Sequence, residues 1–581
     1  MKSIKIIIEY LKTKFWLAML APLCVLIEVG AELVQPKLMS EIVNEGVIAG
    51  DHSLILSIGV KMLLLTLLGV LAGMLSIYAA GQVSYSFGAE MRKNMFSRIQ
   101  RFSFENVDRL QVGSLITRIT DDVNKVQNVI QASMRLLFRA PFLFVGAIVM
   151  VFMLDLRMSY ILMVLMPLLV FIIVYLLRKS YPLFSVVQGK LDKFNTIISE
   201  SLSGVRVVKA YVREDEEKRR FAEANKDYIA ASLKVSTTIM FMMPLMSLVM
   251  NGGVVAVLWF GEYEVQRGNL NVGDIMACTN YLTQVLMSLM MAQHVIMSIT
   301  QAEASMNRIN EVLETEEIIN EVEVEEETMP EEASLEFKNV YFSYESNDTY
   351  QLNDISFKLN AGETLAIIGG TGSGKSSIIN LIPRFYDPQK GEIFIGGKPL
   401  SDIDRRDLQE HIGIVMQSTQ LFSGTIADNL RMGKEDATPE EMKEALRKAQ
   451  ILDFVEGLEN GLEHHIEQDA TNISGGQKQR ISIARTLIKN PRILILDDSL
   501  SAVDLITEAA IRKELVKLRT TKIIIAQRIS SIKNADKILM VDDGRVSGFG
   551  SHAELYESNK LYKEIYDSQV ESANEGKEVS L

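Results

Sequence analysis

Residues 369–376 carry the strongest chemical pattern in the sequence. They follow an apolar run and precede a helical run at 377–381, the context that a phosphate-binding loop requires. Glycines let backbone N–H groups curl around phosphate, while a lysine and a serine reach the outer phosphates and Mg²⁺. A purely structural glycine-rich turn is the alternative, which the flanking strand and helix argue against. The pattern therefore predicts that ATP or GTP is bound with Mg²⁺ by Gly369, Gly370, Thr371, Gly372, Ser373, Gly374, Lys375 and Ser376.

A second pattern lies downstream, where the apolar run 493–496 ends in two adjacent carboxylates. Asp497 follows the run directly, and Asp498 comes next. A carboxylate at the end of such a strand is well placed to complete the coordination shell of a Mg²⁺ ion held by a P-loop hydroxyl. We therefore expect Asp497 to be the Walker B residue and, with Ser376, a Mg²⁺ ligand.

Residues 473–480, between these two patterns, read Ile-Ser-Gly-Gly-Gln-Lys-Gln-Arg. This run resembles the signature motif of ATP-binding cassette (ABC) transporters, which usually begins Leu-Ser-Gly-Gly-Gln, so that only Ile473 departs from it. The resemblance covers nearly the whole chain, which looks like an ABC exporter half-transporter. It implies a membrane α-helical domain of six spans with long intracellular helical loops, followed by a cytoplasmic α/β P-loop ATPase domain of the ABC type.

The resemblance also implies roles for further residues. In the family, an aromatic residue stacks on adenine, a Q-loop glutamine senses Mg²⁺ and the membrane domain, and a D-loop ends in aspartate. These positions match Tyr344, Gln417 and Asp504, although each could instead be a packing residue. Two cassettes of the family sandwich two ATP molecules, so the signature residues contact ATP on another chain's P-loop; here they are Ser474, Gly475, Gly476 and Gln477.

Two departures from the family pattern concern the catalytic residues. A glutamate usually follows the Walker B aspartate and polarises the attacking water, and a histidine on a later strand contacts the γ-phosphate. This chain has Asp498 and Gln527 at those positions. Aspartate is one methylene shorter, and a misplacement of about 1 Å can cost on the order of 10²-fold in rate. Glutamine can donate a hydrogen bond but cannot carry imidazolium charge.

These departures predict a site that binds ATP well and hydrolyses it poorly. Because the signature stays nearly intact, it can complete a competent site on a different partner, and the pattern resembles the degenerate-site subunit of bacterial heterodimeric multidrug exporters. The alternative is a symmetric homodimer in which Asp498 acts as a slower base. A lipid or peptide exporter, or a membrane protein that ATP gates without transport, shares the same motifs.

The elements that must position these residues fall into two kinds. Beyond residue 333, short β-branched runs alternate with helical stretches, as is typical of a mainly parallel α/β sheet. The expected strands are 335–340, 364–368, 412–416, 493–496, 523–526 and 538–541. We therefore expect a nucleotide-binding domain at 333–581, preceded by a Glu-rich solvated linker at 314–332.

Apolar stretches near the length of about 20 residues that a bilayer requires occur only before residue 302. The expected spans are 15–34, 62–81, 136–154, 158–177, 237–260 and 275–301, within a transmembrane domain at 1–313. Lys and Arg gather in the loops after the second and fourth spans, which places those loops and both termini in the cytoplasm of a plasma (inner) membrane protein. The N-terminal residues are expected to form an amphipathic elbow rather than a cleaved signal.

The two long intracellular loops are apolar-periodic, so we expect helices that continue out of the membrane toward the cassette. The family resemblance implies short coupling helices near their tips, around 106–113 and 204–211, which reach the cassettes near Gln417.

Several membrane residues bear on the substrate. Met287, Met290, Met291, His294 and Met297 form one helical stripe of the last span, typical either of core packing or of a surface for varied apolar compounds. Glu28 and Glu32 share a face of the first span, and Arg139 lies inside the third. Such charges face a cavity or a partner, or form structural ion pairs.

Composition sets broader limits. The chain has 581 residues, which calls for at least two domains, and its 48% hydrophobic and 23% charged residues fit an apolar part joined to a polar part. Cys24 and Cys278 lie in apolar runs, which predicts core packing rather than a disulfide scaffold. A net charge of -13 argues against a nucleic-acid partner. The expected partners are a second half-transporter, membrane lipid and a small apolar substrate.

Overall fold

The computed structural model describes residues 2–315, 329–344, 350–499, 503–526, 529 and 532–578. The chain divides into two compact units. The first joins Met1–Gln100 to Gly113–Glu314, and the second joins the short segment Arg101–Val112 to Thr315–Leu581. Residues 316–328, most of the expected acidic linker, lie outside the described residues, so the linker and the exact domain boundaries stay predictions.

The first unit is helical throughout its described elements. Six of its helices or helical runs are long and apolar enough to cross a membrane, which agrees with the six expected spans. A short helix, α1, covers the expected elbow. In chain order the elements are α1 (Lys2–Thr13), α2 (Phe15–Glu41), η1 (Ile42–Val47), α3 (His52–Ile99), α5 (Val112–Thr117), η2 (Arg118–Asp122), α6 (Val123–Leu154), α7 (Leu156–Ser203), α8 (Val205–Ala210), α9 (Glu214–Met240), α10 (Met242–Gln266) and α11 (Val272–Glu314).

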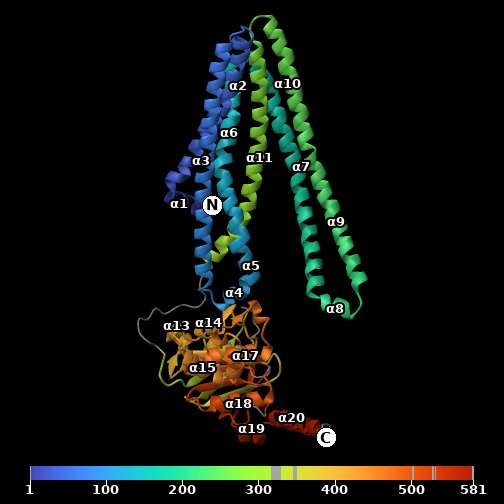
Figure 1. Cartoon of the computed structure of the whole chain (residues 1–581). Helices are drawn as coiled ribbons and strands as arrows, with labels where there is room; N and C mark the ends of the chain where they lie inside the picture. The colour runs from blue at the N-terminus through green and yellow to red at the C-terminus, as the bar shows by residue number, and fades with distance from the viewer. Residues whose placement is uncertain are drawn as a thin grey trace. The chain divides into compact units, whose positions relative to one another are not determined.

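Two sets of helices can be distinguished within this unit. α2, α3, α6 and α11 pack against one another along their lengths, and α7 runs beside α9 as a hairpin closed by α8 (Figure 1). α3 and α7 each hold 48 residues, roughly 70 Å at 1.5 Å per residue, more than twice the hydrocarbon thickness of a bilayer. The expected intracellular helical extensions are therefore present. Cys24 and Cys278 are both free and buried, as expected for packing residues.

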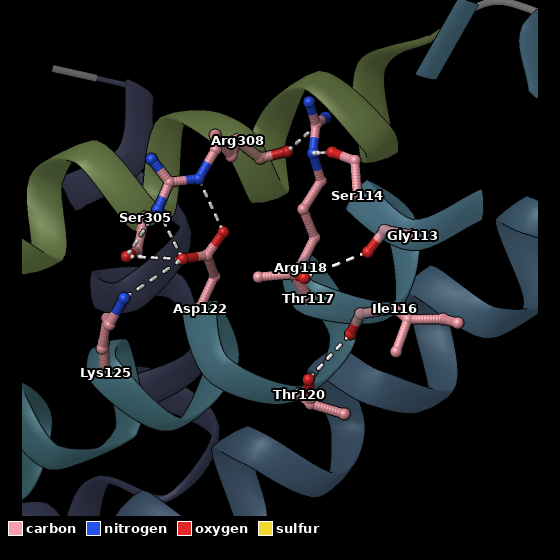
Figure 2. Close-up of polar contacts among 10 residues, drawn as sticks. All are labelled: Gly113, Ser114, Ile116, Thr117, Arg118, Thr120, Asp122, Lys125, Ser305 and Arg308. Carbon is pink, nitrogen blue, oxygen red and sulfur yellow. Dashed lines mark hydrogen bonds and ion pairs between the residues drawn. The ribbon is translucent and has the colours of Figure 1, made fainter. Parts of the chain in front are cut away.

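The π-helical turn η2 and the end of α11 are joined by an ion pair whose carboxylate is buried. Asp122, whose side chain is fully buried, accepts from Arg308 Nε at 2.7 Å through one oxygen and from Ser305 Oγ at 2.8 Å through the other (Figure 2). The neighbouring Arg118 donates to Ser114 Oγ at 3.2 Å and pairs with Glu311 at 2.8 Å. These contacts fix the π-helical turn η2 against α11.

The second unit is built on two main sheets. A six-stranded sheet has the order β12-β11-β3-β10-β9-β6, parallel except for β12, and a four-stranded antiparallel sheet has the order β2-β1-β4-β5. The strands are β1 (Leu335–Phe342), β2 (Leu352–Leu359), β3 (Thr364–Ile368), β4 (Lys390–Ile395), β5 (Lys398–Pro399), β6 (Ile412–Val415), β7 (Gly424–Thr425), β8 (His465–Ile466), β9 (Ile493–Asp497), β10 (Thr521–Ile525), β11 (Lys537–Asp542) and β12 (Arg545–Gly550). All six expected strands are present, within one or two residues at their ends.

Helices cover the sheets and supply the loops of the candidate site. They are α12 (Lys375–Leu381), α13 (Arg405–His411), α14 (Ile426–Arg431), α15 (Pro439–Lys448), α16 (Leu452–Glu456), α17 (Gly475–Leu487), α18 (Leu505–Val516), α19 (His552–Ser558) and α20 (Lys560–Glu578), with 3-10 turns η3 (Leu400–Asp402), η4 (Gly461–Glu463) and η5 (Gln468–Ala470). The β3 and β9 strands are almost entirely buried and end at the same edge of the sheet, where P-loop and Walker B residues follow.

The segment between α3 and α5 packs with the cassette. Its helix α4 (Phe104–Leu110) is capped by Ser103 Oγ, which accepts from Asn106 N at 3.2 Å. The ring of Phe104 lies 4.4 Å from that of Phe385. Short helices thus occur at both expected coupling positions, α4 for 106–113 and α8 for 204–211. α4 contacts the rest of the second unit at the ring of Phe385, and the expected approach to Gln417 stays a prediction.

Candidate nucleotide site

The P-loop joins β3 to α12 by a backbone path that requires glycine. Gly372 and Gly374 have φ of 81° and 101°, the left-handed region that side chains rarely adopt. A Cβ on Gly369 would lie 2.1 Å from the carbonyl oxygen of Val541 on β11. The expected glycines therefore serve loop geometry and close packing, while Gly370 and Gly372 have open space where a Cβ would stand.

Lys375 begins α12 and turns back over the loop. Its Nζ donates to the carbonyl oxygens of Gly369 at 3.0 Å and Gly370 at 2.6 Å. Burial lowers the pKa of the Lys375 ammonium, and the negative charges of Asp497 and Asp498 oppose that change. Lys375 and the two carboxylates at the end of β9 therefore lie close enough to interact electrostatically, although they are far apart in the sequence.

The end of β9 presents two adjacent carboxylates. Burial raises the pKa of Asp497, the charge of Asp498 raises it further, and Lys375 counteracts both. A divalent cation would relieve this repulsion. A carboxylate, the exposed hydroxyl of Ser376 and the amide oxygen of Gln417 are the hard oxygen ligands that Mg²⁺ prefers, so the residues present fit this ion.

Asp498 has a strained and fixed backbone. Its φ is 46°, unusual for a residue with a side chain, and its N–H donates to Ile525 O on β10 at 3.1 Å. The adjacent Asp497 is in register with the same Ile525 across the parallel strands. The position from which the Asp498 side chain extends is thus set by the sheet. Gln527 lies outside the described residues, so its expected role stays a prediction.

The signature motif forms the start of α17. Ser474 is the N-cap: its Oγ accepts from Gln477 N at 3.4 Å, and its N–H donates to Gln477 Oε1 at 2.8 Å, a capping box. Ser474 and Gly475 are exposed, and no atom lies within 4 Å of a Cβ built on Gly475. Ile473, the residue that departs from the family pattern, is buried beneath this exposed helix start.

Tyr344 lies in an aromatic cluster connected to α4. Its ring packs edge-on against that of Tyr386, with 5.0 Å between centroids, and the Tyr386 hydroxyl donates to Asp108 Oδ2 at 2.7 Å. Burial and the Asp108 carboxylate both raise the pKa of Tyr386. The sequence does not predict that Tyr386 links this cluster to α4. The adjacent aromatic residues Phe385 and Tyr386, shortly after α12, are the one local sign of an aromatic cluster here.

The two remaining expected residues lie on other loops. Gln417 is exposed just after β6 and is flanked by Met416 and Ser418, which line a cavity of about 560 Å³. Asp504 is exposed and accepts from Thr507 N at 3.0 Å as the N-cap of α18. No described hydrogen bond or ion pair joins either residue to the P-loop.

Comparison with known proteins defines the family. The ABC transporter transmembrane region model matches residues 18–289, and the ABC transporter model matches residues 352–501. The uncharacterized ABC transporter ATP-binding protein YfiB of Bacillus subtilis (strain 168) is 41% identical over 564 residues, covering 97% of this chain and 98% of that protein. This chain belongs to the ABC transporter family. A second relative, the uncharacterized ABC transporter ATP-binding protein YknU of Bacillus subtilis (strain 168), is 33% identical over 579 residues, which cover 98% of this chain and 99% of that protein.

A solved structure shows the same arrangement of domains. The structure of a bacterial Atm1-family ABC exporter with ATP bound matches with a TM-score of 0.78 and 27% identity, over 96% of this chain and 98% of that chain. The chain is therefore an ABC half-transporter: a multi-pass membrane protein with six spans and one ABC ATPase domain, as the sequence predicted.

Proposed function

We propose that this half-transporter is one subunit of an ATP-driven exporter that moves apolar or amphipathic compounds out of the cell. The family membership supports coupling of ATP hydrolysis to transport, and the likeness to a bacterial Atm1-family exporter supports the outward direction. Export of several drug classes is part of the same proposal. Insertion in the plasma membrane with cytoplasmic termini is also part of it, and the Lys and Arg distribution of the loops supports that orientation.

In this proposal the chain's own ATP site hydrolyses poorly. The observation that carries it is the fixed backbone of Asp498, whose N–H is bonded to Ile525 O and whose neighbour is held in register by the sheet. Because the sheet prevents the backbone from moving toward the nucleotide, a carboxylate one methylene shorter than glutamate does not reach the attacking water. Gln527 in place of histidine would weaken the same step.

ATP and Mg²⁺ would still bind at this site. The P-loop amides and Lys375 would hold the phosphates, and Tyr344 would stack on adenine. Ser376, Asp497 and Gln417 would hold Mg²⁺, which supplies neutralisation of phosphate charge. The intact helix start at Ser474 would complete a competent site on the partner, since backbone N–H groups at a helix N-terminus bind anions.

The tip of the α7–α9 hairpin supports a two-chain assembly. Val205, Val207 and Tyr211, in and beside α8, are exposed apolar or aromatic residues. The cassette cavity of about 560 Å³ beside Gln417 is bordered by Phe422 and Met432, which are 55% and 58% exposed. We propose that α8 of one subunit docks in this cavity of its partner, because both surfaces would then lose apolar exposure.

The membrane unit supports an apolar cargo in general terms. Met287 on α11 is exposed, and Met290 and Met291 are partly buried, so part of the expected stripe is accessible. The side chains of His294 and Met297 lie outside the described part of the chain. Flexible methionine side chains adapt to varied apolar surfaces.

The test is purification of the chain from its native membrane with whatever half-transporter accompanies it. We expect a partner with glutamate and histidine at the positions of Asp498 and Gln527, and ATPase activity only when both chains are present. A disulfide between Val207→Cys of one subunit and Met432→Cys of the other checks the docking. Brisk transport-coupled ATPase of this chain alone as a homodimer would overturn the proposal.

A further inference from the structure

Tyr344, the residue expected to stack on adenine, lies two residues beyond the end of β1. Near that end, the N–H of Gln389 donates to Tyr341 O at 3.0 Å. On the other side of the strand, the N–H of Gln351 donates to Phe342 O at 2.8 Å. A segment that continues beyond a strand needs other partners for its backbone groups if it is to keep one position.

The side-chain amide of Gln389 supplies such partners to Ser343. Its Oε1 accepts from Ser343 N at 2.7 Å, and its Nε2 donates to Ser343 O at 2.9 Å. A primary amide offers an acceptor and donors side by side, so it bonds both backbone groups of one residue as a residue of a neighbouring antiparallel strand does. Because Ser343 is only 5% exposed, water is a poor substitute for these partners. The side chain of Gln389 therefore extends the ladder by one residue, as far as Tyr344.

Two further hydrogen bonds hold Tyr344 itself. Its N–H donates to Gln351 Oε1 at 3.3 Å, and its hydroxyl accepts from Asn380 Nδ2 at 3.4 Å. Both partners lie next to the phosphate-binding loop. Asn380 is on α12, and a Cβ on Gly374 would lie 3.2 Å from Gln351 O. The tyrosine is thus held beside the loop that is expected to bind the phosphates of the same nucleotide.

The two hydrogen bonds to Gln389 are the shorter ones. Distances of 2.7 and 2.9 Å lie within the usual range for N–H···O bonds, whereas 3.3 and 3.4 Å lie beyond it. The ring of Tyr344 also packs against the apolar core of the cassette, but apolar contacts are not directional. The amide of Gln389 is therefore the strongest directional constraint on the backbone that leads into the tyrosine.

We propose that Gln389 is a positioning residue for adenine binding. Its amide fixes the backbone of Ser343, and that backbone sets where the ring of the next residue meets the base. Stacking requires the two rings to overlap at a defined offset, so a displaced tyrosine ring loses part of this interaction. Phosphate binding by residues 369–376 does not depend on the stack. The inference rests on the proposed role of Tyr344 and adds a residue to which the sequence patterns assign no role.

The test is equilibrium binding of two probes to the full-length protein in lipid nanodiscs, measured by isothermal titration calorimetry with Mg²⁺. One probe is adenylyl imidodiphosphate, a non-hydrolysable ATP analogue, and the other is inorganic tripolyphosphate, which has no base. Gln389→Leu removes both hydrogen bonds to Ser343. We expect it to weaken binding of the analogue about fivefold and to change that of tripolyphosphate less than about twofold. General damage to the fold or to the P-loop would weaken both probes.

Three further variants assign the effect. Tyr344→Ala is expected to weaken binding of the analogue about tenfold, as loss of a stacked base predicts, and to spare tripolyphosphate. The double variant should lose no more than Tyr344→Ala alone, because Gln389 acts through the tyrosine. Gln409→Leu is the matched control: its amide on α13 donates to Pro383 O at 3.4 Å, and its loss should change neither affinity.

The outcomes separate this inference from the proposed role of Tyr344. If Tyr344→Ala weakens binding of the analogue and Gln389→Leu does not, the role of Tyr344 stands and the inference is wrong. Equal losses for both probes in Gln389→Leu, or additive losses in the double variant, would also overturn it. Unchanged affinity in Tyr344→Ala would overturn the role of Tyr344 and the inference with it.

Discussion

The P-loop face and the signature face of the cassette differ in how far each departs from the family pattern. On the P-loop face, Asp498 and Gln527 replace the usual water-polarising and phosphate-contacting residues, and Asp498 is attached to a backbone that the sheet holds in place. On the signature face, the only change is Ile473, which is buried away from the exposed helix start. The departures from the family pattern therefore lie on the P-loop face, and in our proposal only hydrolysis of this chain's own ATP is impaired.

The largest effect is expected on the signature face. Gly475→Asp places a carboxylate at an exposed helix N-terminus with open space around it, so the fold should persist while the partner's γ-phosphate is repelled. We expect ATPase activity per heterodimer to fall on the order of 10²-fold or more. The melting temperature should stay near that of the wild type. Activity within a few fold of wild type would show that this face does not complete a working site.

The next largest effect belongs to the P-loop lysine. Lys375→Ala removes the ammonium that lies over the loop and should weaken ATP affinity of this chain by roughly tenfold or more, measured by nucleotide titration. ATPase per heterodimer should fall less than in Gly475→Asp, since little chemistry passes through this site. Lys517→Ala, which removes an exposed lysine paired with Glu514, is the control. Unchanged ATP affinity would refute the P-loop assignment.

A gain is expected when the short carboxylate is lengthened. Asp498→Glu extends the side chain by one methylene from the same fixed backbone and should raise hydrolysis at this site about tenfold. The rise should be partial because Gln527 remains. The measurement is single-turnover hydrolysis in a heterodimer whose partner carries glutamine in place of its own catalytic glutamate. No gain would mean that side-chain length is not what impairs the site.

A smaller effect is expected where α4 meets the aromatic cluster. Tyr386→Phe keeps the ring against Tyr344 but removes the hydrogen bond to Asp108. Loss of this hydrogen bond should lower the free energy of local unfolding of α4 by about 1 kcal/mol, which should raise its amide hydrogen exchange about fivefold. Exchange in α17 should not change, since the described contacts of α4 are with Phe385 and Tyr386. Equal changes in both helices would point to general destabilisation instead.

The smallest effect completes the comparison. Asp498→Asn removes the negative charge of this side chain. Because little ATP is hydrolysed at this site in our proposal, the ATPase rate per heterodimer should change less than about twofold. The partner's glutamate changed to glutamine is the control and should abolish most turnover. A loss in Asp498→Asn as complete as that in Gly475→Asp would make Asp498 a true catalytic base and would remove the asymmetry between the two faces.

Local patterns in the sequence were sufficient for most of the fold. The six spans and the six strands 335–340 to 538–541 are continuous apolar or β-branched runs, so composition alone identifies them. The strands that were missed, among them β2, β4 and β12, pair antiparallel and contain polar residues, and β2 and β12 lie at sheet edges. Their hydrophobic signal is weaker because one face of such a strand need not be buried.

The sequence by itself determined the family and predicted the phosphate-binding loop and the shortened carboxylate, because each depends on residue types within a few positions of one another. Only the tertiary structure decided which distant side chains meet. Asp108 and Tyr386 are separated by 278 positions and Glu28 and Arg139 by 111, yet each pair is hydrogen bonded. No pattern in the sequence indicates that Arg135 faces Glu28. Such contacts follow from the packing of whole helices against one another, and that packing depends on the summed burial of many side chains rather than on any local pattern.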